Sequence, residues 1–71
     1  MDIEELSIDN CSGDLDNINV IVNNVRKKVA MGAKKVILKI PRGKFVECLD
    51  ILRTISTEFI YISLEVYETN G

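Results

Sequence analysis

Hydrophobic and polar residues recur along the chain with two different periods. Between Ile3 and Ile8 a short apolar stretch is typical of a strand, and a cluster of turn-forming residues at 9–14 closes it. Apolar residues then recur every three or four positions, as they do on one face of a helix: Ile18, Ile21, Val22, Val25 and Val29. Gly32 ends this helix, because glycine adopts the left-handed conformation after a helix at least cost. The pattern predicts a strand followed by a helix.

The second half of the chain repeats this order and adds a third strand. The β-branched run 36–40 predicts a strand that Pro41 closes, since proline has no N–H for a ladder hydrogen bond. A helix is predicted from about residue 44 to residue 56, with four apolar residues on its inner face: Phe45, Leu49, Leu52 and Ile55. From 59 to 67 apolar residues fall at every second position, which is typical of a strand with one buried face.

The resulting order, β-α-β-α-β, predicts an α/β fold built as a two-layer α+β sandwich. The right-handed crossover rule makes strands one and two parallel if they are neighbours in the sheet. The third strand separates into an apolar face and a mixed face, so we expect both helices to pack on one face of the sheet. No repeat, linker or low-complexity tract divides the chain, and we expect a single domain over residues 1–71.

Composition narrows the class of protein. Hydrophobic residues make up 46% of the chain, which is typical of a folded domain, and no apolar run reaches the roughly 18 residues of a membrane span. We therefore expect a cytoplasmic protein whose Cys11 and Cys48 are reduced, with Cys48 acting as a small buried apolar residue. The chain has no histidine, which excludes histidine-assisted nucleophilic catalysis and most zinc sites. We expect no enzyme activity, no cofactor and no metal.

Charge is distributed in blocks. The net charge is −2, yet all but one of the nine basic residues lie in the stretch 26–44, which holds no carboxylate and is called the basic band below. One interpretation is a solvated surface whose first cations complement the negative end of a helix. The other is a ligand site, because the band includes the loop at the carboxyl end of a strand. There Arg42, Gly43 and Lys44 offer a guanidinium, an approachable backbone and an ammonium, which together suit phosphate.

The segments 32–39, 42–44 and 46–50 resemble the second strand, the basic-glycine-basic loop and the second helix of Alba-type nucleic-acid-binding proteins. The resemblance implies an Alba-like fold and weak, largely sequence-independent binding to the RNA or DNA backbone. By the match, Lys39, Arg42 and Lys44 are the contacts. The remaining nucleic-acid-binding candidates belong to the same band: Lys34, Lys35 and Gly43. Asp14 and Leu15 stand where the family carries a lysine pair.

A second hypothesis is a protein-protein interaction module or a homodimerising domain that binds no nucleic acid. The acidic ends and basic centre of the chain could match those of a partner or of another copy. Phe59, Tyr61 and Tyr67 alternate on the second face of the predicted third strand, where they either stack on bases or form a subunit interface. The sequence leaves both functions open.

Overall fold

The computed structural model describes residues 2–70, which form three strands and two helices in the predicted order. The first strand is followed by a long helix, and the second strand by a shorter one. Their bounds are β1 Ile3–Ser7, α1 Leu15–Ala30, β2 Lys35–Pro41, α2 Leu49–Glu58 and β3 Ser63–Thr69. Gly32, with φ at +104°, follows α1 as predicted.

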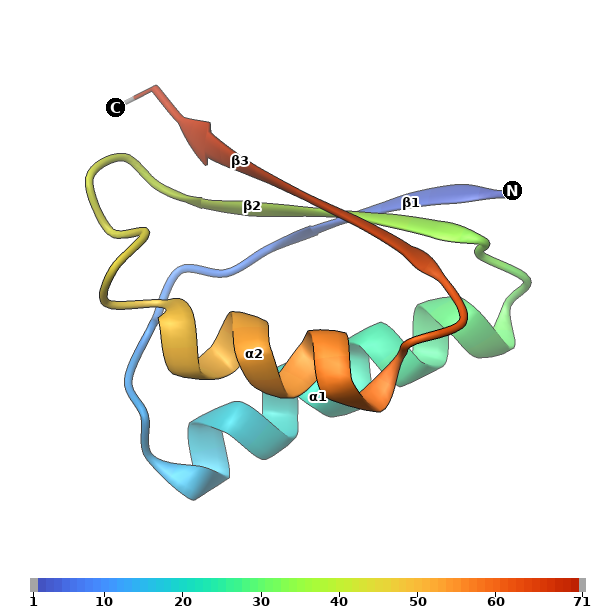
Figure 1. The fold of residues 1–71 in the computed structure, drawn as a ribbon, viewed down its shortest axis with the longest axis horizontal. Helices are drawn as coiled ribbons and strands as arrows, with labels where there is room; N and C mark the ends of the chain where they lie inside the picture. The colour runs from blue at the N-terminus through green and yellow to red at the C-terminus, as the bar shows by residue number, and fades with distance from the viewer. Residues whose placement is uncertain (1, 71) are drawn as a thin grey trace.

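The three strands form one sheet in the order β1-β2-β3, and both pairs are parallel. The predicted parallel pairing of the first two strands is therefore confirmed. Each crossover moves the chain one strand further in the same direction. Two right-handed crossovers of this kind place their helices on the same side, and Figure 1 shows α1 and α2 together below the sheet.

The core lies between the sheet and the two helices. Alternate residues of β2 point into it, because side chains along a strand alternate between the two faces. The buried residues come from every element except β1 and β3, with additions from the loops: Ile8, Ile21, Val22, Val25, Ala33, Val36, Leu38, Ile40, Cys48, Ile51, Ile55 and Phe59. No helix within residues 2–70 is long and apolar enough to cross a membrane.

The second helix differs from its prediction in both position and orientation. It begins at Leu49 instead of about residue 44, and its buried face consists of Cys48, Ile51, Ile55 and Phe59. Phe45 and Leu49, which were expected in the core, are 44% and 39% exposed. The physical reason is the segment 41–48, which forms turns, the first of them through Gly43 with φ at +77°, and so delays the helix. Cys48 then enters the core and sets which side of α2 faces inward.

The third strand also begins later than predicted, at Ser63, and this separates the three aromatic residues. Phe59 is buried at the end of α2, Tyr61 lies in the following turn with 71% of its surface exposed, and only Tyr67 belongs to β3. The expectation that they share one strand face is wrong. Phe59 lies four residues after Ile55, so it continues the helical spacing, and this spacing prevails over the alternation that begins at the same residue.

The expectation of reduced cysteines is also wrong, because Cys11 and Cys48 form a disulfide with their Cα atoms 4.7 Å apart. Cys11 lies in the loop after β1, and Cys48 lies in the segment after β2. These segments meet because the carboxyl ends of parallel strands share one edge of the sheet. Disulfides persist mainly in oxidising compartments, so the cytoplasmic location loses the support that reduced thiols were expected to give.

Candidate functional site

The basic band does not gather on one surface. Lys34 precedes β2, while Arg42, Gly43 and Lys44 follow it, and the 7 residues of the strand separate the two groups by about 23 Å at roughly 3.3 Å per residue. Lys35 and Lys39 lie between them, on the face of the sheet turned away from the helices. Of the predicted nucleic-acid contacts, the structure brings together only the three loop residues 42–44.

Carboxylates from other parts of the chain pair with most of the band. Lys39 contacts Glu5 of β1 at 2.6 Å, and Lys44 contacts Glu47 at 3.2 Å. The remaining pairs connect different elements: Arg26 with Glu58, Lys28 with Glu4, and Lys35 with Glu65. A cation beside a carboxylate attracts phosphate less, because the two fields oppose each other. The acidic ends of the chain thus neutralise much of its basic centre.

The pair between Lys35 and Glu65 extends to Tyr67 through a hydrogen bond that the tyrosine hydroxyl donates to the carboxylate. The hydrogen bond from Lys35 and then that from Tyr67 hold the pKa of Glu65 below its usual value. Hydrogen bonding to Glu65 raises the pKa of Lys35 and, separately, that of Tyr67. This cluster keeps Lys35 charged and paired with a carboxylate of the protein itself.

The ion pairs also cover the outer face of the sheet. Ile37 lies in the central strand, level with Glu5 on one side and Glu65 on the other. Lysine side chains cover neighbouring apolar surface with their methylene groups while the ammonium stays in water. All-parallel sheets usually have both faces covered. Lys35 and Lys39 are therefore well placed to shield Ile37, a structural role that needs no ligand.

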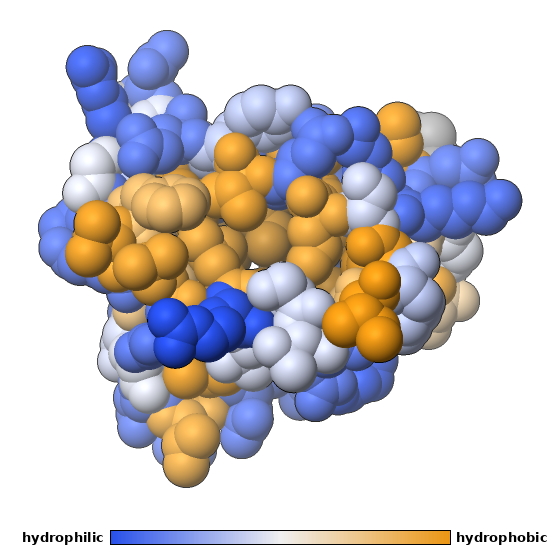
Figure 2. Space-filling view, viewed as in Figure 1, coloured by the Kyte–Doolittle hydropathy of each residue, from blue (hydrophilic) through white to orange (hydrophobic). Residues whose placement is uncertain are grey.

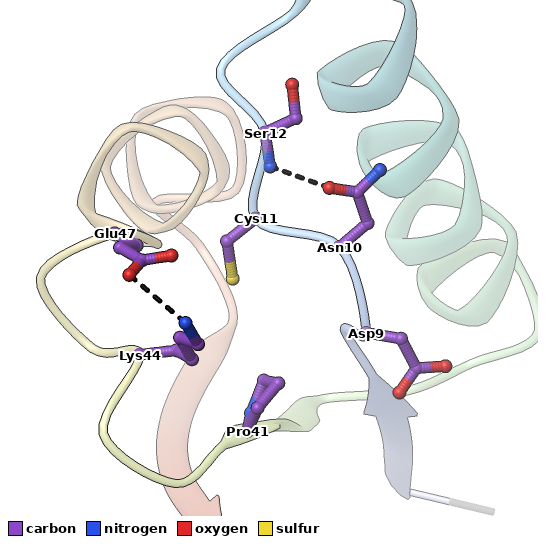
Figure 3. Close-up of a pocket in the computed structure, with 7 residues that line it drawn as sticks. All are labelled: Asp9, Asn10, Cys11, Ser12, Pro41, Lys44 and Glu47. Carbon is purple, nitrogen blue, oxygen red and sulfur yellow. Dashed lines mark hydrogen bonds and ion pairs between the residues drawn. The ribbon is translucent and has the colours of Figure 1, made fainter.

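A hollow of about 530 Å³ lies at the carboxyl edge of the sheet, between the loop after β1 and the segment after β2 (Figure 3). Lys44 and Glu47 both belong to the segment after β2 and bond to each other on one side of it, whereas the carboxylate of Asp9 points away from them. Its other lining residues are Asn10, Cys11, Ser12 and Pro41. The only ammonium here is bonded to a carboxylate, and α2 begins at Leu49. Among the described residues that line it, the hollow has neither the free cation nor the adjacent helix terminus expected of a phosphate site.

The aromatic residues do not form a base-stacking surface. Phe59 and Tyr61 meet edge to face with ring centroids 6.5 Å apart, and the Arg26 guanidinium lies 6.0 Å from the centroid of the Phe59 ring. Tyr67 lies on β3, bonded to Glu65. Of the three residues predicted to stack on bases, Phe59 is buried, and the two exposed tyrosines belong to different segments.

An apolar groove with a volume of about 380 Å³ lies between α2 and β3. It is called the α2–β3 groove below, and its lining residues are Leu38, Phe45, Leu49, Leu52, Arg53, Ser56, Leu64 and Val66. Figure 2 shows apolar side chains gathered and hollowed across this side of the molecule. Beside the groove, β3 forms an edge of the sheet, because β1-β2-β3 is the full strand order within residues 2–70.

Sequence reasoning assigned three residues of this groove, Phe45, Leu49 and Leu52, to the core. The signal that distinguishes the two outcomes is an excess of apolar residues. Between residues 45 and 55 apolar side chains occupy more positions than one helix face can bury: Phe45, Val46, Cys48, Leu49, Ile51, Leu52 and Ile55. One set enters the core through Ile51 and Ile55, whereas Phe45, Val46 and Leu49 remain exposed and Leu52 is only partly buried.

Comparison with protein-family models, with curated proteins and with solved structures finds no match to this chain. The resemblance to Alba-type proteins therefore stays a prediction from the residues 32–50.

Proposed function

We propose that this chain is a protein-interaction module that binds an extended segment of a partner polypeptide at the edge of β3 and in the α2–β3 groove. The observation that carries the proposal is the position of an uncovered apolar helix surface directly beside an unpaired strand edge. Exposed apolar patches rimmed by polar residues mark interaction sites in soluble domains. A bare strand edge offers backbone donors and acceptors to an incoming chain.

The two features suit one mode of binding. An extended segment that adds to β3 as a fourth strand forms main-chain hydrogen bonds along Ser63–Thr69. Its alternate side chains enter the groove, because residues of a strand point alternately to the two faces of the sheet. Leu64 and Val66, which are half-buried in the free chain, become covered. The favoured partner segment has apolar residues at every second position.

The expected affinity is modest. Burying a leucine or phenylalanine side chain completely contributes about 1.5–3 kcal/mol, and the groove residues are already partly covered. Phe45, Leu49 and Leu52 therefore contribute on the order of 1 kcal/mol each. Backbone pairing adds to this sum, while ordering the partner segment opposes it. A dissociation constant in the micromolar range or weaker is expected, since about 8.2 kcal/mol is needed at 1 μM.

Peptide selection tests this proposal. A library of displayed twelve-residue peptides is selected against the protein, and a binding peptide is titrated while backbone amide shifts are followed by nuclear magnetic resonance. We expect alternating apolar sequences, with shifts concentrated on β3 and α2. Phe45→Asp should weaken binding at least tenfold, whereas Val20→Asp should not, because Val20 is an exposed apolar residue on α1. Selection of no alternating sequence, or equal binding by both variants, would refute the proposal.

Nucleic-acid binding is the second candidate, supported by Arg42 and by the Alba-type resemblance. Arg42 is exposed beside Gly43 and forms no ion pair with the residues that the structure describes. Fluorescence anisotropy with short RNA and DNA duplexes at about 50 mM salt tests it, because phosphate contacts are strongest at low salt. Binding that Arg42→Glu with Lys44→Glu abolishes would establish this function. No binding at tens of micromolar protein would end it.

A further inference from the structure

A single covalent bond joins the loop after β1 to the start of α2. Cys11 supplies the loop side, and Cys48 supplies the other as the residue that immediately precedes α2. Within residues 2–70 no hydrogen bond or ion pair connects 9–14 with 42–50. In this part of the described chain the disulfide is therefore the one bond, covalent or polar, between the two segments.

The loop side of the disulfide is anchored independently of it. The backbone N–H of Ser12 donates to Asn10 Oδ1 at 2.9 Å. The side-chain amide of Asn17, a residue of α1, donates to the backbone carbonyls of Asn10 and Ser12 at 2.9 and 3.0 Å. These bonds fix the loop to α1, so it should keep its place when the disulfide opens.

The segment 42–47, on the other side, has no comparable anchor. All of its residues are exposed, and the hydrogen bonds and the ion pair that the structure describes for it stay between residues 41 and 49. Cys48 is the first fully buried residue after it. Phe45 and Leu49, called the groove wall below, lie on either side of Cys48 and line the α2–β3 groove. The position of the groove wall thus depends on how firmly Cys48 is held.

The two sulfur atoms differ in their access to solvent. Cys48 is buried, whereas Cys11 is partly exposed and lines the hollow of about 530 Å³. Figure 3 shows the sulfur of Cys11 pointing into this hollow. Sites for small organic molecules have volumes of roughly 300–1,000 Å³, so the hollow has room for a small thiol. A thiol that arrives from solvent therefore meets the sulfur of Cys11 first.

We infer that Cys11 is a thiol-modification site, and that its reaction with a small thiol opens the disulfide and releases the groove wall. A thiolate attacks Sγ of Cys11, the bond to Cys48 breaks, and Cys48 leaves with the electron pair and takes up a proton. A second thiolate attacks the mixed disulfide and leaves Cys11 as a thiol. Two small thiols are thereby oxidised to their disulfide, and their two protons and two electrons reduce the cysteine pair.

This inference rests on the proposed function, since it names a chemical reaction that regulates the same groove. With the disulfide closed, the groove wall is already in position for a partner. With the disulfide open, binding must first order the segment 42–49, and ordering a segment opposes binding. The reduced chain should therefore bind a selected peptide about tenfold more weakly than the oxidised chain.

Mass spectrometry identifies the reactive sulfur. The folded protein is treated briefly with excess reduced glutathione, acidified, unfolded and alkylated with N-ethylmaleimide. Trypsin, which cleaves after Lys44, then separates the two cysteines. We expect glutathione on Cys11 and the alkyl group on Cys48, whereas the same treatment in denaturant should place glutathione on both. Glutathione on both cysteines of the folded protein, or on neither, would overturn the site.

Nuclear magnetic resonance measures the release of the groove wall. Backbone order parameters at 42–49 should fall from about 0.85 to below about 0.6 on reduction, while those of α1 stay near 0.85. The matched control is Cys11→Ala, in which 42–49 should be mobile with or without reductant. If α1 loses its order as well, or if 42–49 stays rigid, the disulfide does not control the groove wall and the inference is wrong.

Peptide titrations of both forms separate this inference from the proposed function. Equal affinity of the oxidised and reduced chains for a selected peptide would refute the regulation and leave the groove as a binding site. If no peptide binds either form while glutathione still reacts at Cys11 and loosens 42–49, the thiol site stands and the proposed function fails.

Discussion

The two β-α-β crossovers of this small domain have the same topology but differ in how much of their apolar surface they bury. In the first, the 16 residues of α1 bury Ile21, Val22 and Val25 between the helix and the strands. In the second, α2 has 10 residues and buries Ile51 and Ile55, while apolar residues on its other side stay exposed in the groove. The first crossover completes its own core, and the second leaves an apolar surface for another chain.

The cause of this difference lies in the connection that follows β2. The segment 42–48 forms turns, although its apolar residues fit the pattern of a longer helix. Phe45 therefore remains outside the core. The disulfide then fixes Cys48 toward the loop after β1. A helix that starts later and faces inward through Ile51 leaves Leu49 exposed and Leu52 only partly buried. The comparison shows that a crossover can keep its topology while its helix gains a second exposed apolar surface.

The largest expected effect separates the buried side of α2 from its groove side. Ile55→Ala should lower the free energy of unfolding by about 2–5 kcal/mol, because it leaves a cavity at a fully buried position. Leu49→Ala should cost about 1 kcal/mol or less, since that side chain is already partly exposed. Urea denaturation followed by circular dichroism at 10 μM protein measures both. Equal losses would contradict the assignment of the two sides.

Loss of the disulfide should come next in size. Cys11→Ala removes the cross-link between the two loops and leaves Cys48 as a small buried residue, with an expected loss of about 2–4 kcal/mol. Thermal unfolding should show a lower melting temperature for the variant. Adding a reductant should lower the wild-type melting temperature to a similar extent and leave that of the variant unchanged. If the reductant leaves the melting temperature of the wild type unchanged, the disulfide does not stabilise the second crossover.

The pair between Lys35 and Glu65 should give a smaller effect that depends on pH. The lowered pKa of Glu65 means that its contribution is present above the unfolded value of about 4.3 and is lost as pH falls through the folded value. The raised pKa of Lys35 means that its contribution is present below about 10.4 and is lost as pH rises through the folded value.

Glu65→Gln removes both contributions, so the stability difference between wild type and variant should be level near neutral pH and shrink toward both extremes. Denaturant titrations at several pH values measure this difference. Tyr67→Phe is the matched control, because it removes one hydrogen bond to Glu65 but keeps Lys35. A stability difference that stays constant down to pH 2 would contradict the linkage between this cluster and folding.

The smallest expected effect concerns the basic band. Glu5→Gln with Glu47→Gln removes the carboxylates that pair with Lys39 and Lys44, so the variant should bind duplex RNA or DNA more tightly than the wild type. The slope of log affinity against log salt should steepen by about 0.9 for each lysine that engages a phosphate. Anisotropy titrations at several salt concentrations measure it. Equal slopes would mean that the carboxylates do not limit these lysines.

The parts of the fold that follow local rules were predictable from the sequence. The element order follows from the alternation of periods, and Gly32 marks the end of α1 because of its conformational freedom. The parallel pairing of β1 and β2 follows from the handedness of crossovers. Each of these depends on neighbouring residues or on a rule that holds for all chains.

The features that join distant segments were not predictable in the same way. The approach of Cys11 to Cys48 depends on which strand ends share an edge, and their spacing of 37 residues carries no such information. The pairing of Lys39 with Glu5 depends on strand register. Predicting the groove requires knowing which apolar side of α2 packs into the core. A hydrophobic pattern does not show this, because Phe45 and Ile51 are both simply apolar in it. Tertiary contacts decided each case.

Accessibility of methyl groups to a soluble paramagnetic probe tests most directly whether the α2–β3 groove is open in the single chain and closed by a partner. At low protein concentration the methyl signals of Leu49, Leu52 and Val66 should be strongly broadened, while those of Ile51 and Ile55 stay sharp. With a selected peptide, the groove signals should become protected while that of Val20 does not. Groove methyls as protected as Ile51 at low concentration would contradict the account.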